Sequence, residues 1–489
     1  MKIELKRSGS NSLDSIYLNK DKEFRGHFTG NQIKLLPFKT NPSGDNFTED
    51  FKSFQGITGE LFRILNSKQQ IGLDKSKGLF KTEFRENTLK NAIDKVETDN
   101  IEELKNILTK LFFEEDQSLI KFNIKTLSYM NFISSDNAIK EVSKFIHDLF
   151  LTDDFHLLNL NEDTDYENIL HQLILQSLPE LQDLISKSEN SHYSNLFPQL
   201  KDLFIKDFTF LTTNNSYLLK HVEDFFKFYY FQYLSQLIIN FNSYGNGVKK
   251  IKPIYFTMDW ETLSESRLSS HTISWKQLNN YSPLIFAHVN TLELLNYIYI
   301  NDKPIGYYDN IVSLYNSLNF EEKEKFDYYI DELISFYTGS ISLKSGSWDE
   351  CKRHLNLDIK TKKFDNSISK AIYSLWYLIN YQFSNTERKN ADVKYGKWYS
   401  QFGKVNYTKN RGRLGNTTIL SQELLLFLTR ICIGSDDKIR LKTLWDKFKD
   451  RGIVFDEATK LEITKLFEKI NLIEKKSDSG DAQYVKSTI

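Results

Sequence analysis

The sequence predicts a mainly α, multi-domain helical protein with a small irregular, partly β N-terminal segment and a C-terminal winged helix. The 489 residues include only 20 glycines and 7 prolines, and so few chain breakers favour helices over a sandwich or barrel with many turns. Apolar residues recur at helical spacing over most of the length. Since one hydrophobic core seldom serves more than about 250–300 residues, we expect several domains.

Residues 1–51 are the predicted irregular segment. "KIELKR" alternates in the manner of a strand, and "IKLLPFKT" is a short apolar run broken by Pro37. The first forty residues carry eight Lys or Arg and four Asp or Glu. The start "MKIELKRSGSNS" has no apolar core of a secretory signal, so a cytoplasmic location is expected.

Residues 52–385 are the predicted helical body. In "TDNIEELKNILTKLF", Asn100 can cap the helix, and Ile101 and Leu108 lie on one face. A strand-like island, "PIYFTMDW", interrupts the helices near residues 250–260, after a Gly-rich turn. The most apolar stretch, "FFKFYYFQYLSQLIINF", is too polar and too short to cross a bilayer, so we expect a buried helix and no membrane contact.

Residues 386–416 are predicted to be a basic, aromatic-rich linker. Between Arg388 and Arg413 the chain has eight Lys or Arg and one acid, Asp392, with five aromatic residues interleaved. Lys and Arg neutralise phosphates, and aromatic rings can stack on bases. The candidate DNA contacts here are Lys394, Lys397, Trp398, Lys404, Lys409, Arg411 and Arg413. The alternative is a basic connector whose aromatic side chains only anchor it to the helical body.

Residues 417–489 are predicted to fold as a winged helix, three helices followed by a β-hairpin. The first helix stops at Gly434, the third is capped by Asp456, and Gly480 suits the hairpin turn. The presumed recognition helix, 457–469, carries three acids and three lysines, a balance that fits a protein-binding surface at least as well as a DNA reader. The residues here that could still reach phosphates are Thr459, Lys460, Lys475 and Lys476.

The sequence offers no recognisable catalytic motif. A phosphate-binding loop is missing, since Gly396-Lys397 and Gly403-Lys404 lack its upstream glycine and its downstream Ser or Thr. The histidines considered lie singly and are interpreted as packed or surface residues: His27, His147, His171, His288 and His354. Cys351 and Cys432 have no metal-type spacing. We therefore expect no cofactor, no metal and no enzyme activity.

Two acidic groupings have residue types that could hold a metal ion. Asp309, Glu321 and Lys323 have roughly the composition of a nuclease centre, but "NFEEKEKFDYYIDEL" reads as an amphipathic helix with a solvated charged face. "MDWETLSESR" brings together four charged residues, which we interpret as an ion-paired helix start. These are Asp259, Glu261, Glu265 and Arg267.

Four stretches together resemble the DptG family, the middle-sized component of the bacterial DNA-phosphorothioation-dependent restriction system. They are "LLPFKT", "MDWETLSESR", "RGRLGNTTILSQELLLFLT" and the tail "DRGIVFDEATKLEITKLFEKINLIEKKSDSGDAQYVKSTI". The resemblance implies a cytoplasmic subunit that acts with DptF-like and DptH-like components, which supply ATP-dependent and nucleolytic functions. It also implies a complex that attacks double-stranded DNA lacking the host's sulfur mark, with no catalytic residues to carry over.

The expected function is therefore a non-catalytic, DNA-contacting assembly subunit of such an antiviral restriction complex. Two alternatives stay open at this point. One is a transcription regulator that uses the winged helix, although most of the chain would then need another purpose. The other is a divergent metal-dependent nuclease whose carboxylates are scattered through the helical body.

Overall fold

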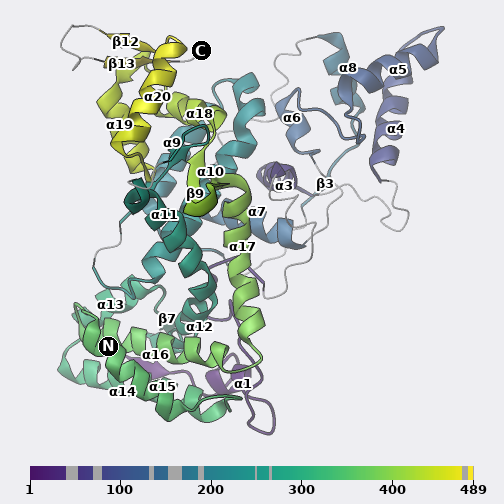
Figure 1. The fold of residues 1–489 in the computed structure, drawn as a ribbon. Helices are drawn as coiled ribbons and strands as arrows, with labels where there is room; N and C mark the ends of the chain where they lie inside the picture. Colours follow the sequence, from purple (N-terminus) through teal and green to yellow (C-terminus); the bar gives the residue numbers. More distant parts are fainter. Residues whose placement is uncertain are drawn as a thin grey trace. The chain divides into compact units, whose positions relative to one another are not determined.

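The protein is mainly helical, with few and short strands, as the sequence predicts (Figure 1). The computed structural model describes residues 1–39, 53–69, 80–130, 137–151, 168–184, 192–247, 250–263, 267–475 and 483–487. The chain divides into two compact units, each assembled from three separate stretches. Unit 1 comprises Met1–Gly44, Gln232–Leu420 and Lys449–Glu462; unit 2 comprises Asp45–Phe231, Ser421–Phe448 and Ile463–Ile489. This division does not follow the four contiguous segments predicted above.

Unit 1 holds most of the long helices. Its helices are α1 (Leu13–Tyr17), the last part of α10 (Asn215–Phe241), α11 (Leu268–Tyr281), η3 (Ser282–Leu284), α12 (Ile285–Leu295), α13 (Tyr308–Ser317), α14 (Phe320–Ser340), α15 (Trp348–Thr361), α16 (Ser367–Ser384), α17 (Lys389–Tyr407), η4 (Gly412–Leu414) and the start of α20 (Glu457–Lys469). Every residue of α12 is buried, and α12 packs against α14, α16 and α17 (Figure 1). The core of unit 1 is therefore centred on α12.

Short strands join distant parts of the sequence within unit 1. β1 (Ile3–Leu5), predicted from "KIELKR", pairs antiparallel with β6 (Ile298–Ile300), which also pairs with β7 (Lys303–Pro304). The predicted island forms β4 (Ile254–Tyr255) and β5 (Thr257–Met258). β4 pairs in parallel with β11 (Ile453–Val454), and β5 pairs in parallel with β9 (Asn416–Leu420), whose other neighbour is β8 (Thr408–Asn410).

Unit 2 is built from helices and a few strand residues. Its elements are α3 (Gln55–Leu65), β2 (Lys68–Gln69), α4 (Phe80–Ile93), α5 (Ile101–Phe112), α6 (Ile124–Leu127), α7 (Asn137–Phe150), α8 (Ile169–Ser177), β3 (Gln182–Asp183), α9 (Pro198–Leu211), the first part of α10 (Asn215–Phe241), α18 (Gln422–Ile433), β10 (Lys438–Arg440), most of α19 (Leu441–Asp450), the end of α20 (Glu457–Lys469), β12 (Ile473–Lys475) and β13 (Gln483–Lys486).

Aromatic packing stabilises the centre of unit 2. Phe204 of α9 stacks on Phe150 of α7, with ring centroids 4.5 Å apart, and lies 4.9 Å from Phe225 of α10. Such ring pairs contribute about 0.5–1.5 kcal/mol each beyond the area they bury. The apolar stretch of α10 is thus the buried helix that the sequence predicts. No helix in the described part of the chain is long and apolar enough to cross a membrane.

The C-terminal segment has the predicted three helices, α18, α19 and α20. α18 ends at Gly434, whose φ of +69° suits glycine, and Asp456 Oδ1 caps α20 by accepting from Thr459 N at 2.8 Å. The two final strands pair antiparallel, with Glu474 opposite Tyr484. A third strand, β10, pairs with β13, which the prediction of three helices and a hairpin did not include. Gly480 lies outside the described residues.

The prediction of a linker at 386–416 needs correction, because residues 389–407 form the helix α17. The aromatic residues there are spaced three and four apart, which places them on one side of a helix. That stretch also has, within it or next to it, two glycines and five Lys or Arg residues, which interrupt the helical spacing of its apolar residues. The sequence therefore resembles that of a connector.

Candidate nucleic-acid interface

The inner face of α17 is aromatic and fully packed. Tyr395, Trp398, Tyr399 and Phe402 are each at most 1% exposed. Trp398 stacks on Phe38 at 5.6 Å between centroids, and its Nε1 donates to the carbonyl of Lys39 at 3.0 Å. An indole with covered faces and a satisfied N–H cannot stack on a base. Trp398 is therefore withdrawn from the candidate DNA contacts, and the anchoring role proposed in the connector alternative describes it better.

One glycine of this segment, Gly396, has a packing role as well. A Cβ placed on Gly396 would lie 2.3 Å from the carbonyl oxygen of Ser282, far inside van der Waals contact. Gly396 therefore lets α17 approach the short helix η3 closely. Its backbone faces protein, so the glycine gives no sign of a ligand that needs close approach.

The outer face of α17 is basic. Lys394, Lys397 and Lys404 are exposed, and no ion pair or hydrogen bond of their side chains is recorded within the described ranges. At a rise of 1.5 Å per residue the three span about 15 Å of helix. The sole acid of the helix, Asp392, is only 9% exposed. The outward side thus carries positive charge without a neighbouring carboxylate from its own helix; we call Lys394, Lys397 and Lys404 the basic stripe.

Beyond the helix, Lys409 and Arg411 bind the protein's own backbone. Lys409 Nζ donates to the carbonyl of Asp259 at 2.6 Å. Arg411 donates to the carbonyls of Glu261 at 2.6 Å and Met258 at 2.8 Å. Partial burial lowers the pKa of Arg411. Both cations hold the turn that follows β5.

Arg413 differs from these two neighbours. It lies exposed in η4, and no partner of its side chain is recorded in the part of the chain that the structure describes. Of the three basic residues after α17, it is the one whose charge faces water. We therefore group Arg413 with the basic stripe as a candidate phosphate contact.

The C-terminal candidates are paired with acids. Lys460 lies 2.7 Å from Glu457, and Lys475 lies 2.8 Å from Glu468. Such surface pairs contribute little stability, but each reduces the local positive potential that a phosphate would meet. Lys476 lies outside the described residues. Thr459 is fully buried and donates to Glu261 Oε2 at 3.1 Å, so it cannot reach a phosphate.

The mid-chain motif is an ion-paired network, as interpreted from the sequence. Arg267 lies 3.2 Å from Glu261 and 2.8 Å from Asp456, which caps α20. Glu261 is 5% exposed and also accepts from the backbone N of Met258 at 2.7 Å. The network joins the strand-like island to the start of α20, 189 residues later in the chain. Glu265 lies outside the described residues.

No metal centre is found in the described ranges, where no group of three or more His, Cys, Asp or Glu side chains could hold an ion. Lys323, which the nuclease hypothesis would place beside the metal, lies over the ring of Tyr315, 5.5 Å from its centroid. His27 is partly buried, and its desolvation lowers its pKa to about 3; its Nε2 lies 2.8 Å from Tyr337 Oη. Burial also lowers the pKa of His288 well below its usual value.

Other sequence candidates are packing residues too. Cys351 and Cys432 are buried, and burial raises the pKa of Cys351 to about 12, which makes it a poor nucleophile.

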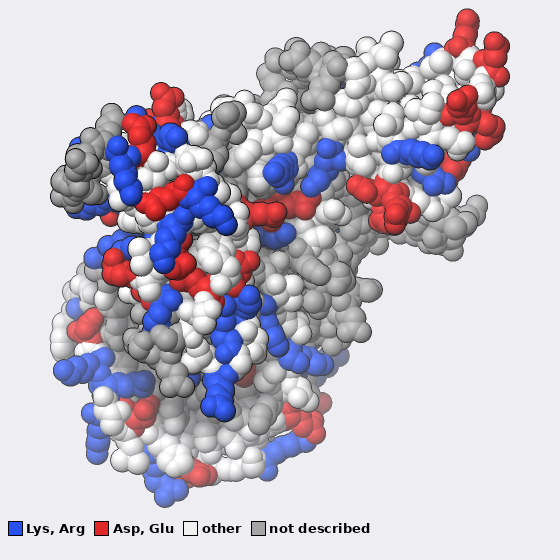
Figure 2. All heavy atoms as spheres, turned by 45° about the horizontal axis from the view of Figure 1, so that its top comes forward, with Lys and Arg blue, Asp and Glu red and all other residues white. Residues whose placement is uncertain are grey.

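Charge on the molecule is otherwise mixed. Figure 2 shows Lys and Arg interspersed with Asp and Glu over the face that it presents, in keeping with a formal net charge of −1. A nucleic-acid contact must therefore depend on a local group such as the basic stripe. Comparison with protein-family models and with curated proteins gave no match.

Proposed function

We propose that this chain is a non-catalytic, DNA-contacting assembly subunit of a phosphorothioation-dependent restriction complex. The resemblance of four sequence stretches to DptG supports the choice of system. On this proposal its partners are DptF-like and DptH-like components. The assembled complex acts on double-stranded DNA that lacks the sulfur mark, and the chain works in the cytoplasm.

The proposed DNA contact is supported mainly by the difference between the buried and the exposed side of α17. Its aromatic side chains and its one acid face the core, whereas Lys394, Lys397 and Lys404 face outward. A helix anchored by a rigid aromatic face presents its lysines at fixed positions, which favours repeated backbone contacts. Lys side chains on such a face would contact phosphates and give no base specificity. This is expected of a subunit that positions DNA for the other subunits of the complex.

The salt dependence of DNA affinity tests this contact. Each phosphate contact contributes about 0.9 to the slope of log K against log salt concentration. Replacing Lys394, Lys397 and Lys404 together with Ser should reduce that slope by up to about 2.7 and weaken binding at low salt. Binding is measured by fluorescence anisotropy on a labelled duplex, with the chain alone and with its co-purified partners.

A matched control uses three exposed lysines of α15 and α16, Lys352, Lys360 and Lys370, replaced in the same way. That variant should keep the wild-type slope. Equal slopes for the stripe variant and the wild type would contradict the DNA contact. Magnesium-dependent nicking of DNA by the purified chain alone would instead favour the nuclease alternative.

We interpret residues 417–489 as a winged helix that binds a protein partner. The support is the order of helices and strands together with the pairing of Lys460 and Lys475 with acids. Neutralised lysines suit a contact with another subunit better than one with phosphates. This is also why the transcription-regulator alternative is not favoured.

A further inference from the structure

Helices α4, α5 and α8 share a small hydrophobic core within unit 2. It includes Phe84 and Leu89 from α4, Leu108 and Phe112 from α5, and Ile174 from α8, each at most 2% exposed. Leu108 and Phe112 are the two buried residues of α5. Because they lie four positions apart, they form one narrow line along the helix. The core therefore uses a single edge of α5.

The remaining apolar side chains of α5 face solvent. Ile101, Ile107 and Leu111 are 53%, 43% and 49% exposed, and Leu104 is partly buried. These four residues follow one another at intervals of three and four, so each is next to the following one on the helix surface. At a rise of 1.5 Å per residue they extend over about 15 Å. We call Ile101, Leu104, Ile107 and Leu111 the apolar stripe.

Neither packing nor helix formation in the described part of the chain accounts for the apolar stripe. Single exposed apolar side chains are common on protein surfaces and need no explanation. Among the described helices, however, α5 is the one that exposes three large apolar side chains within 12 residues, whereas α15 exposes one, Leu357. Isoleucine is also a poorer helix former than Lys, Glu or Gln. Uncovered apolar residues at this spacing are typical of a face on which another helix packs.

Acidic side chains accompany the apolar stripe. Residues 94–116 contain eight Asp or Glu, all exposed, and three Lys, which gives a formal charge of −5. One of these lysines, Lys105, lies 2.8 Å from Glu86 of α4 and is thus neutralised. Glu103 precedes Ile107 by four residues and so borders the stripe, and Glu114 follows the end of the helix. Figure 2 shows Asp and Glu side chains gathered around this part of unit 2. The stripe therefore lies in a locally negative field.

This negative charge decides among the possible occupants of the exposed apolar face. A second copy of the chain would bring the same acids to the contact, and like charges at an interface are unfavourable. Nucleic acids and anionic lipid surfaces are repelled for the same reason. A positively charged helix with an apolar side complements both the stripe and its acids.

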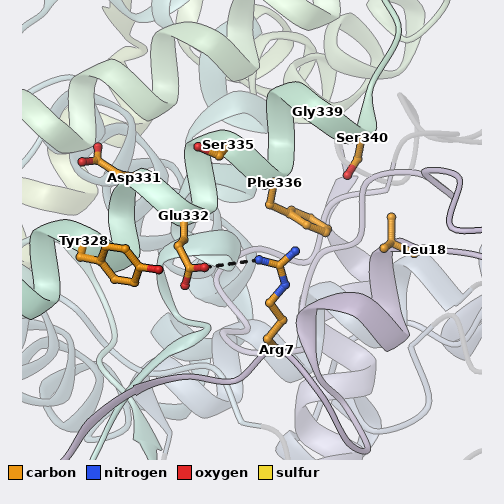
Figure 3. Close-up of a pocket in the computed structure, with 9 residues that line it drawn as sticks. All are labelled: Arg7, Leu18, Tyr328, Asp331, Glu332, Ser335, Phe336, Gly339 and Ser340. Carbon is orange, nitrogen blue, oxygen red and sulfur yellow. Dashed lines mark ion pairs between the residues drawn. The ribbon is translucent and has the colours of Figure 1, made fainter.

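The pocket beside α14 in unit 1, of about 510 Å³, offers no comparable match (Figure 3). Arg7 on its wall lies 3.6 Å from Glu332 and 3.4 Å from Asp14, so this cation is neutralised within the chain. Figure 3 shows Asp331 directed away from Arg7. The apolar stripe, in contrast, combines an uncovered apolar face with an excess of one charge.

We propose that the apolar stripe of α5 binds a basic amphipathic helix of a partner protein. Apolar residues of that helix, spaced three and four apart, pack on Ile107 and Leu111. Its Lys or Arg side chains lie beside Glu103 and Glu114 and fix its orientation. The interface belongs to unit 2 and shares no residue with the basic stripe, so the inference does not depend on the proposed DNA contact.

The test uses the full chain and a labelled amphipathic probe peptide, acetyl-LKKLLKLLKKLLKL-amide, with binding followed by fluorescence anisotropy. Ile107→Gln together with Leu111→Gln should weaken binding at least about tenfold, because the centre of the apolar contact is lost. Glu103→Gln together with Glu114→Gln should weaken it about threefold and make it less sensitive to salt. Both variants should melt at the wild-type temperature, since the replaced side chains are exposed.

The matched control replaces two exposed apolar residues of other helices, Leu357→Gln together with Leu461→Gln, and should bind like the wild type. The peptide with Glu in place of Lys should not bind. Failure of the basic peptide to bind the wild-type chain, or equal binding by the wild type and the double variant at Ile107 and Leu111, would overturn the proposal. A dimer in sedimentation velocity that this variant loses would assign the stripe to a second copy. Binding to phosphatidylserine vesicles that the variant loses would assign it to a membrane, and either result would also overturn the proposal.

Discussion

Trp398 and Lys397 are neighbours in the sequence of α17, but the first is buried and the second is exposed. The indole is 1% exposed and hydrogen-bonded to Lys39, whereas the ammonium group is exposed. A basic stretch with interleaved aromatic residues thus separates into a structural face and a charged face once it is helical. The residue types alone do not distinguish stacking on bases from packing in a core.

Replacement of Trp398 by Ala should therefore affect stability and not the DNA contact itself. Truncating a fully buried Trp costs about 3–5 kcal/mol of unfolding free energy, which denaturant titration measures. The salt slope of DNA binding should stay unchanged wherever the variant remains folded, since an indole releases no counterions. Trp260→Ala is the control, because Trp260 is 38% exposed. A Trp398 variant of wild-type stability that binds DNA weakly would restore the stacking hypothesis.

Asp392 allows a second prediction at this scale, on pH dependence. It is 9% exposed, its Oδ1 has no hydrogen-bond partner among the described residues, and burial raises its pKa to about 7. The unfolded chain loses this proton near pH 4 and the folded chain near pH 7. The folded state therefore binds more protons in that window, and the group's contribution to the unfolding free energy falls as pH rises.

Asn at this position cannot titrate, so the difference in unfolding free energy between the wild type and Asp392→Asn reports that contribution. The wild type should lose stability relative to the variant between about pH 4 and pH 7, by at most about 4 kcal/mol, and stay level above that range. Denaturant titrations at several pH values measure it. The change Asp349→Asn, at an exposed position, serves as the control. A pH-independent difference for Asp392 would contradict the effect of burial.

At the scale of the element, the same substitution should have opposite effects in two helices. Gly396→Ala in α17 places a methyl group 2.3 Å from the carbonyl of Ser282 and should destabilise the fold by about 1–3 kcal/mol. Gly339→Ala in α14 meets no atom and should raise stability by up to about 1 kcal/mol. Thermal and denaturant unfolding of the two variants check the signs. Equal effects would mean that α17 does not approach η3 as closely as described.

Elements with a strong local signal were predicted well from sequence. Ile101–Phe112 is a helix, although Ile101 of its predicted apolar face is 53% exposed; α18 stops at Gly434, and "KIELKR" and "PIYFTMDW" contain strands. β10 was missed because three residues of strand next to a helix carry almost no periodic signal. α17 was missed because its exposed lysines and two glycines weaken the apolar pattern. For both misses, the deciding information lies in tertiary contacts.

At the scale of the whole molecule, sequence could not show which distant stretches lie together. Arg267 binds Asp456, and Phe38 stacks on Trp398, through contacts that no local pattern encodes. The pocket beside α14 was likewise not foreseen, because its wall combines Arg7 with residues more than three hundred positions later.

The parallel pairing of β4 with β11 has a consequence for how the protein is made. β4 leaves the ribosome about two hundred residues before its partner, and at about 5–20 residues per second that interval lasts about 10–40 s. During this time the apolar strand "PIYF" has an unpaired edge, of the kind that pairs with other chains. The interval between the synthesis of β1 and that of its partner β6 is longer still, because β6 follows β1 by almost three hundred residues. Unit 1 can therefore be completed only after residues 449–462 have been made, and a nascent chain interrupted before residue 453 exposes a strand edge that the folded protein covers.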